Sequence, residues 1–253
     1  MKKVLVIIPC YNEENGIGKV IDDIPIEKLA ALGYKAEVLV LDNNSSDRTA
    51  EIARSKGAKV IEELRQGKGY AIQTSFRNIP NDINIVVMID GDNSYKSQEM
   101  IRLIEPIDSG FCEVILGTRL SGKISENSMP YFNRVGNWLF TFLVRVGYSG
   151  NVTDVCTGYF AWKKEAVDEL SRHIEANGFS IEMEMVTKIT KLGFNIFSVP
   201  ISYLNREGKS SLKPLRDGSV ILYTWLRNLF WVPIRRNFVP CTSIRKQFAK
   251  QNE

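Results

Sequence analysis

Short apolar runs alternate with amphipathic segments along the first half of the chain. Val4–Ile8 and Ile83–Ile89 have the length and branched composition expected of strands buried on both faces. In Glu14–Ile24 the apolar residues instead recur with helical spacing and would form one face of a helix. By these patterns the predicted strands are Val4–Ile8, Glu37–Leu41, Ala58–Ile61, Ile83–Ile89, Glu113–Leu116 and Asn195–Val199. The predicted helices are Glu14–Ile24, a segment from Ser46 through Ala53, part of Gly67–Ile79, and Gln98–Ile107.

The alternation of strands and helices predicts the α/β fold class, with a mostly parallel sheet covered by helices on both faces. Ligands of such sheets bind beyond the carboxyl ends of the strands. Asp42 and Asp90 each follow a predicted strand directly. We therefore expect their carboxylates to share one crevice.

The second half of the chain is less regular. Residues 118–130 are polar and predict a loop. The predicted helices that follow are Tyr131–Gly147, Glu165–Glu175, Glu182–Lys191 and a last one that begins at Pro214, after a basic loop at 204–213.

Val220–Val232 combines apolar, aromatic and basic residues. As a helix it would be roughly 20 Å long, too short to span a bilayer. Two tryptophans and Arg227 favour a helix that lies in the lipid interface, and the alternative is a core helix packed on the domain. We expect a catalytic domain at 1–218 and, at 219–253, an amphipathic helix and basic tail at the membrane surface.

Composition narrows the class of protein. The chain has 253 residues, 44% of them hydrophobic and 25% charged, which is typical of a globular protein. No apolar run approaches the ~20 residues of a transmembrane helix. Met1 and two lysines lead straight into the first strand, so no secretory signal is expected. Four dispersed cysteines indicate a reduced, cytoplasmic chain without structural zinc, and one histidine, His173, excludes mechanisms that need several.

Charge is concentrated at the C-terminal end. Residues 201–253 hold ten Lys and Arg against three Asp and Glu, whereas the first 200 residues hold 23 against 26. This imbalance suggests a surface for phosphate or anionic lipid, and a solvated tail is the alternative. Nucleic acid is not expected, because the basic residues lie among apolar stretches rather than in a continuous stripe.

Asp90-Gly91-Asp92 is the sharpest candidate for chemistry. Two carboxylates one residue apart at a strand end can both face the crevice if the chain turns, and Gly91 permits a tight turn. Mg²⁺ or Mn²⁺ prefers such oxygens and is held by one or two carboxylates together with substrate phosphates. Such an ion would neutralise a diphosphate leaving group. The alternative is an Asp-Gly turn without a metal.

Residues after the other strands extend this candidate site. Asp42 could accept hydrogen bonds from a base or ribose, Tyr11 could stack on a base, and Glu13 could bind a ribose hydroxyl or simply begin a helix. Neither Gly16–Lys19 nor Gly67–Gly69 completes a dinucleotide or Walker motif, although Lys68 could still contact a phosphate.

In their order and spacing, the motifs resemble the family 2 inverting glycosyltransferases of GT-A (Rossmann-like) fold, and among them the polyprenyl-phosphate (dolichyl-phosphate) sugar synthases. The segments that carry the resemblance are Pro9–Glu13, Asp42–Thr49, Arg65–Gly69, Asp90–Asp92, Gly117–Arg119, Asp154–Tyr159 and Arg206–Leu212. The chain departs from the family pattern at three positions: Asn43 and Ser211 replace an aspartate and a lysine, and Ser94 takes the place of a third metal ligand.

The resemblance implies a single displacement with inversion, in which a hexose or N-acetylhexosamine passes from a UDP- or GDP-sugar to a polyprenyl monophosphate with Mg²⁺ or Mn²⁺. A phosphate acceptor needs no strong base, and Arg119, Arg206 and Ser210 are expected to bind it. If the acceptor is instead a glycan hydroxyl, a base is required, and Asp154 or Glu184 would supply it. The predicted donor-binding residues are Pro9, Tyr11, Glu13, Asp42, Asn44, Lys68, Asp90 and Gly91, and Asp90 and Asp92 are the predicted metal ligands. The enzyme is expected at the cytoplasmic face of a membrane as a peripheral protein.

Overall fold

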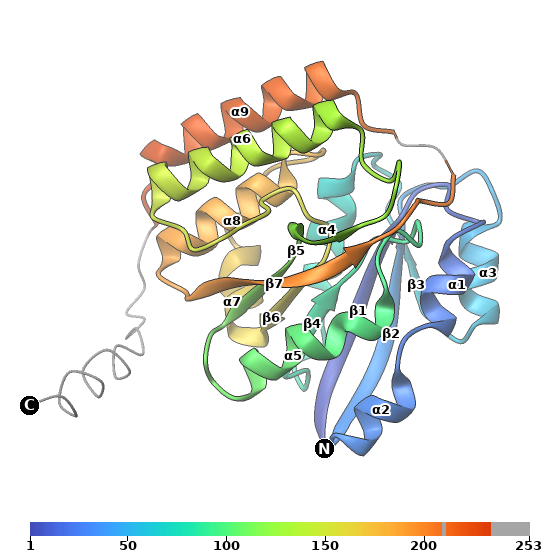
Figure 1. Cartoon of the computed structure of the whole chain (residues 1–253). Coiled ribbons are helices and arrows are strands. Elements are labelled where there is room, and N and C mark those ends of the chain that lie inside the picture. Colours follow the sequence, from blue (N-terminus) through green and yellow to red (C-terminus); the bar gives the residue numbers. More distant parts are fainter. Residues whose placement is uncertain (209–210, 234–253) are drawn as a thin grey trace, which may run out of the picture.

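The computed structural model describes residues 1–208 and 211–233. One seven-stranded sheet with strand order β3-β2-β1-β4-β6-β5-β7 forms its centre (Figure 1). The strands are β1 (Lys2–Cys10), β2 (Tyr34–Asp42), β3 (Lys59–Glu62), β4 (Ile85–Met88), β5 (Val114–Ile124), β6 (Phe160–Lys163) and β7 (Ile196–Tyr203). The helices are α1 (Ile17–Asp22), α2 (Ile26–Ala31), α3 (Thr49–Ser55), α4 (Lys68–Arg77), α5 (Met100–Asp108), α6 (Tyr131–Tyr148), α7 (Lys164–Ser171), α8 (Ile181–Leu192) and α9 (Pro214–Phe230), with a short 3₁₀ turn at Ser97–Glu99.

The predicted fold class is confirmed. Strands β3, β2, β1 and β4 are parallel neighbours, and β5 pairs with β7 in parallel. The exception is β6, which pairs antiparallel with both β4 and β5. This strand joins the two parallel groups, and it was not predicted.

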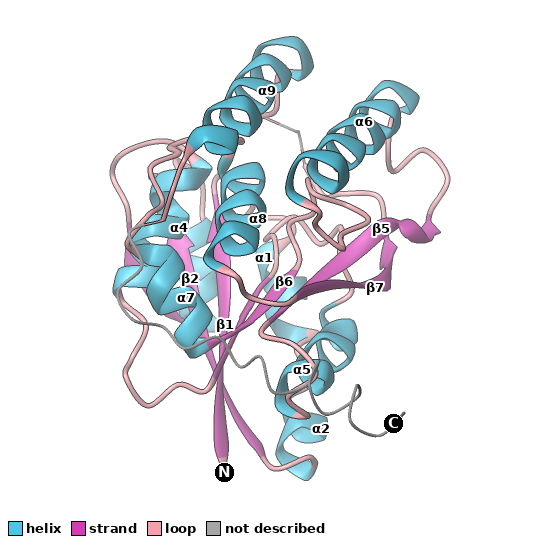
Figure 2. Cartoon of the chain, turned by 90° about the vertical axis from the view of Figure 1, so that its left-hand side faces the viewer, coloured by secondary structure: helices cyan, strands magenta, loops and turns pink. Residues whose placement is uncertain are grey.

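Alternating side chains of the strands enter two separate cores. Ile7, Leu41 and Met88 point to the side covered by α4, α7 and α8, where they pack with Phe76 and Trp162. Residues of the opposite parity, such as Val6, Val40 and Val87, face α1, α3 and α5. Burial on both faces explains why these strands are continuous apolar runs. Figure 2 shows the sheet between these two sets of helices.

Two long helices lie beyond α8 at one end of the molecule. Figure 1 shows α6 and α9 side by side there. The Tyr148 hydroxyl donates a 2.6 Å hydrogen bond to the carbonyl of Trp225, and a Cβ on Gly147 would lie 3.0 Å from the Trp225 ring. The predicted domain boundary at residue 218 falls within α9. No helix among residues 1–208 and 211–233 is long and apolar enough to cross a membrane.

Besides β6, three segments differ from prediction. Residues 118–124, expected in a loop, continue β5 and pair with β7. Helix α2 was not predicted. Helix α3 begins at Thr49 rather than near Ser46, and the Asp47 carboxylate accepts the backbone N–H of Thr49 at 3.0 Å.

Candidate active site

Asp90-Gly91-Asp92 follows β4 and is enclosed by backbone. A Cβ on Gly158 would overlap the Asp90 carboxylate, and one on Gly16 would lie 2.6 Å from the carbonyl oxygen of Gly91. A Cβ on Gly91 would meet the Cys10 sulfur at 2.5 Å. The turn therefore requires glycine at three positions that are far apart in the sequence, and this close packing fixes where both carboxylates lie.

The turn lies where two cavities meet. The strand-side cavity, of about 500 Å³, lies along the carboxyl ends of β1 and β4 and includes Pro9, Tyr11 and Asn43. The helix-side cavity, of about 450 Å³, extends between α6 and α9. The residues that line both are Lys68, Asp90, Asp92, Phe179 and Arg206.

A cationic side chain contacts each carboxylate of the turn. Lys68 Nζ lies 2.8 Å from Asp90 Oδ1 and 2.7 Å from Glu182 Oε1. Arg206 Nη2 lies 3.1 Å from Asp92 Oδ2 and 3.3 Å from Glu13 Oε1. Burial alone would lower the pKa of Lys68, but Asp90 and Glu182 hold that pKa above its usual range.

Burial and neighbouring negative charges also raise the pKa values of three carboxyl groups in this cluster. Burial and the neighbouring Asp90 raise the pKa of Asp92. Burial, with the charge of Asp92, raises the pKa of Glu13 to about 8. Burial also raises the pKa of Glu182, although Lys68 opposes the shift. Buried charges of one sign disfavour ionisation, so this cluster is built to accept more positive charge.

Hydrogen bonds hold Arg206 over the turn. After β7, the N–H of Leu204 bonds the carbonyl of Ser94 at 2.8 Å, and the N–H of Glu207 bonds the carbonyl of Asp92 at 2.8 Å. Ser210, predicted to help bind the acceptor, and Lys209 lie outside the described residues.

The donor set fits a divalent cation. Asp90 and Asp92 are hard oxygen donors facing a cavity, and Mg²⁺ or Mn²⁺ commonly takes two carboxylates and completes its shell with phosphate and water. Within the described part of the chain, no cluster of three or more His, Cys, Asp or Glu could hold a metal. The Ser94 hydroxyl donates to Asp92 Oδ1 at 2.5 Å, so here it orients that carboxylate.

The segment after β2 lies beside these carboxylates. Asp42 is buried, does not line either cavity, and has one oxygen, Oδ1, without a hydrogen-bond partner among the described residues. Asn43 donates to the carbonyls of Glu63 and Arg65 at 3.1 and 2.7 Å and accepts the N–H of Gly67 at 2.7 Å. Asn44 is exposed with a φ of 60°. Asn43 thus holds the loop that leads to Lys68.

The glycines around Lys68 have a packing role. A Cβ on Gly67 or Gly69 would overlap the carbonyl oxygens of Asn177 and Ala176. The N–H of Gly69 donates to the Asn177 carbonyl at 3.1 Å. This close approach brings Lys68, at the start of α4, against the start of α8 and therefore beside Glu182.

Arg119 is held by Asp154. Its Nε and Nη2 lie 2.7 and 2.8 Å from the two Asp154 oxygens, and its Nη2 also donates to the Cys156 carbonyl at 2.7 Å. Asp154 is fully buried and Arg119 lines the helix-side cavity. The guanidinium also lies over the Tyr203 ring, 5.2 Å from its centre. Asp154, a candidate base, is therefore placed to orient Arg119.

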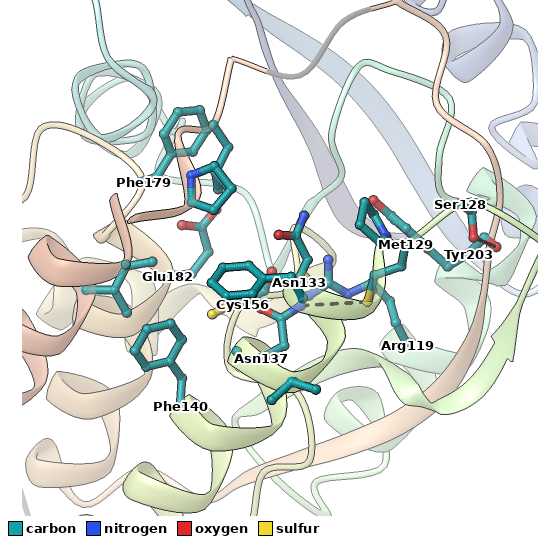
Figure 3. Close-up of a pocket in the computed structure, with 18 of the residues that line it drawn as sticks. Arg119, Ser128, Met129, Asn133, Asn137, Phe140, Cys156, Phe179, Glu182 and Tyr203 are labelled. Atoms are coloured by element: carbon teal, nitrogen blue, oxygen red, sulfur yellow. Dashed lines mark hydrogen bonds between the residues drawn. The ribbon is translucent and has the colours of Figure 1, made fainter. Parts of the chain in front are cut away.

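Glu184, the other candidate base, lies outside both cavities. Its carboxylate contacts Lys188 and Arg227 at 2.7 Å each and accepts the N–H groups of Glu175 and Ala176 at 2.9 and 2.7 Å. Glu182, two residues earlier, faces the helix-side cavity instead (Figure 3). The sequence shows two candidate carboxylates in this segment, and the phase of α8 brings Glu182 to the cavity.

Polar and apolar side chains together line the helix-side cavity. Arg119, Asn133 and Glu182 are among its polar side chains, and Phe140 and Phe179 are among its aromatic ones (Figure 3).

Of the predicted site residues, those that line the strand-side cavity are Pro9, Tyr11, Glu13, Lys68, Asp90, Gly91, Asp92 and Arg206.

An open, mostly parallel sheet with an Asp-x-Asp turn at its carboxyl edge defines the class of GT-A glycosyltransferases. The sequence pattern of glycosyl transferase family 2 matches residues 5–171, and the chain belongs to that family.

Sequence relatives agree with this assignment, and a solved structure shares the fold. A dolichyl-phosphate hexose transferase of Haloferax volcanii is 35% identical over 85% of this chain and 89% of its own length. An undecaprenyl-phosphate mannosyltransferase of Micrococcus luteus is 26% identical over 83% of this chain and 87% of its own. Glucosyl-3-phosphoglycerate synthase of Mycobacterium tuberculosis, solved with Mn²⁺, uridine diphosphate and glucosyl-3-phosphoglycerate, has the same fold, with a TM-score of 0.69, 24% identity, and coverage of 92% of this chain and 81% of that one.

Proposed function

We propose that this glycosyltransferase transfers a hexose or N-acetylhexosamine from a UDP- or GDP-sugar to a polyprenyl monophosphate, with inversion and with Mg²⁺ or Mn²⁺. The observation that carries the proposal is the position of Asp90 and Asp92 at the junction of the two cavities. The strand-side cavity would hold the nucleotide diphosphate, and the helix-side cavity, partly apolar, would hold the lipid phosphate.

The chemistry requires two anions to be brought together. A phosphate monoester has its second pKa near ~6 and is largely dianionic at neutral pH, so it attacks without a base. Arg119, oriented by Asp154, and Arg206, at the shared edge of both cavities, would bind that phosphate and align it. Asp90 and Asp92 would hold a divalent cation, which would supply the positive charge that neutralises the leaving diphosphate.

Exposed apolar side chains on α6 and α9 support a peripheral position on a membrane. Tyr131, Trp138 and Phe142 of α6 are exposed, as are Tyr223 and Phe230 of α9. Helix α6 carries two arginines and no acidic residue. Apolar and aromatic side chains combined with positive charge favour an interface with anionic lipid. We therefore propose that α6 acts together with the predicted 219–253 segment, of which residues 234–253 lie outside the described chain.

A hydroxyl acceptor on a glycan is the alternative, and it would need a base. Asp154 and Glu184 both make ion pairs away from solvent, and Glu182 is held by Lys68. This engagement of the candidate bases favours the phosphate acceptor.

A direct assay separates the two acceptors. Radiolabelled UDP- and GDP-sugars would be incubated with polyprenyl phosphate or with a free glycan, each with Mg²⁺, Mn²⁺ or EDTA. The expected result is labelled product in the organic phase that depends on metal. Transfer to the glycan alone would contradict the lipid-phosphate proposal, and product that persists in EDTA would contradict its metal dependence.

A further inference from the structure

Lys68 is the feature whose role the proposed function leaves open. Its ammonium group lies between Asp90 and Glu182, at 2.8 and 2.7 Å, and its side chain is 16% exposed. Asp90 is one of the two carboxylates proposed to bind the divalent cation. The Asp90 carboxylate would therefore have to serve both Lys68 and the metal.

A lysine ammonium in contact with Asp90 weakens the attraction of that carboxylate for a second cation, because the two positive charges repel each other strongly in a partly buried site. Lysine differs from arginine in having a compact charge on a flexible stem, so it can move without leaving its cluster. Lys68 has a second carboxylate in contact, Glu182, which would keep its charge paired after it leaves Asp90. Lys68 also lines both cavities, so space for that movement lies on either side.

The loop around Lys68 fixes its backbone through the two glycines that flank it. Gly67 and Gly69 make the close contacts with Asn177 and Ala176. The Lys68 side chain makes its two polar contacts with Asp90 and Glu182.

We propose that Lys68 is a positioning residue that neutralises Asp90 in the empty site, releases it to a divalent cation, and then pairs with Glu182 and the donor diphosphate. This inference rests on the proposed function. It makes metal and diphosphate binding cooperative, because each ligand favours the same movement of Lys68.

The test measures binding of Mn²⁺ alone to the full chain by the loss of the free-ion electron paramagnetic resonance signal. Lys68→Met removes the competing cation and is expected to bind Mn²⁺ roughly 5- to 100-fold more tightly than the wild type, the usual range of site coupling. Glu182→Gln leaves Lys68 on Asp90 alone and is expected to weaken Mn²⁺ binding. Lys68→Arg keeps a cation beside Asp90 that moves less freely than lysine, and it is expected to bind Mn²⁺ no more tightly than the wild type.

A double variant separates direct competition from a general change in charge. Lys68→Met with Glu182→Gln leaves the net charge of the cluster unchanged and also avoids an unpaired buried carboxylate that could impair folding. Direct competition predicts that this variant binds Mn²⁺ about as tightly as Lys68→Met. Lys164→Met, which breaks a pair with Asp168 outside both cavities, is the matched control and is expected to keep wild-type affinity.

Wild-type affinity in the folded double variant, or unchanged or weaker binding in Lys68→Met, would overturn the role of Lys68 and leave the proposed function intact. Absence of Mn²⁺ binding in every variant, with UDP and GDP also present, would overturn both.

Discussion

The Arg119 guanidinium and the Asp154 carboxylate form a buried two-point ion pair, with N···O distances of 2.7 and 2.8 Å. Asp154 also accepts the backbone N–H of Arg119 at 3.0 Å. Two hydrogen bonds in one plane fix the guanidinium, which leaves little freedom for its outer edge in the helix-side cavity.

Asp154→Asn breaks this pair and leaves a buried guanidinium unpaired. We expect the free energy of unfolding to fall by about 3–5 kcal/mol. Urea unfolding would measure the change. Replacing both partners, as Arg119→Met with Asp154→Leu, should restore much of the stability but not the transfer to polyprenyl phosphate. Wild-type activity in that double variant would contradict the acceptor-binding role of Arg119.

Gly158→Ala tests the placement of Asp90. The added Cβ would overlap the Asp90 carboxylate, so the carboxylate must shift. A displacement of about 1 Å at a reacting centre costs roughly 100-fold in rate, and we expect a loss of that size in kcat. The matched control is Gly178→Ala, where a Cβ would meet no atom within 4 Å. Equal activity of the two variants would contradict the expected crowding.

Asn43→Asp is expected to destabilise this chain. A carboxylate cannot donate to the carbonyls of Glu63 and Arg65, and it would place negative charge against both. We expect a loss of about 1–3 kcal/mol of unfolding free energy, the cost of unsatisfied buried polar groups. Thermal unfolding of the variant beside Asn44→Asp, an exposed neighbour, provides the measurement and its control. An equal effect of the two changes would speak against the bridging role of Asn43.

Glu63 makes stability depend on pH. Hydrogen bonds from Arg65 and from the Thr74 hydroxyl lower the pKa of Glu63 to about 2. A carboxyl group whose pKa is lower in the folded state stabilises the fold above its unfolded pKa, and that stability is lost as pH falls through the folded pKa.

Glu63→Gln should therefore be less stable than the wild type by about 1–3 kcal/mol near neutral pH, where the partial exposure of Arg65 reduces the effect. The difference should shrink as pH falls from about 5 toward 2. Urea unfolding at several pH values would follow it. A difference that stays constant over this range would show that the charge of Glu63 is not its source.

Trp138→Ser with Phe142→Ser tests the membrane surface. The two rings stack with centroids 5.8 Å apart on exposed positions of α6, so their removal opens no core cavity. Loss of two inserting aromatic side chains should weaken binding to anionic liposomes at least about tenfold, as measured by sedimentation. Phe111→Ser, exposed outside α6 and α9, is the control. Equal binding of all three proteins would exclude α6 from the interface.

The sequence was sufficient for the parts of the fold that local patterns determine. The predicted strand Ile83–Ile89 contains an unbroken apolar run from Ile85 because both faces of β4 are buried, and that burial is visible in the sequence. Strand β6 was missed because four residues between a motif and a helix give too short a pattern. The end of β5 was missed because most of its residues from Thr118 onward are polar, as in a loop. They form a strand there because they run beside β7.

The candidate site was predictable where a residue follows a strand, and less so where its partner is distant. Asp90 and Asp92 lie at the predicted strand end. The choice between Glu182 and Glu184 depends on Lys68 and Arg227, which are remote in sequence. The role of Asn43 likewise depends on the carbonyls of a loop twenty residues later.

The polar contacts between α8 and α9 have a consequence for how this enzyme can be modified. Arg227 reaches Glu184, and Lys191 donates to the carbonyls of Leu229 and Trp231 at 2.6 and 2.7 Å. Because of these contacts, α9 cannot be replaced by an unrelated helix without losing bonds to α8. Any change of α9 designed to alter the proposed membrane contact would have to preserve these polar contacts and replace only the outward-facing side chains.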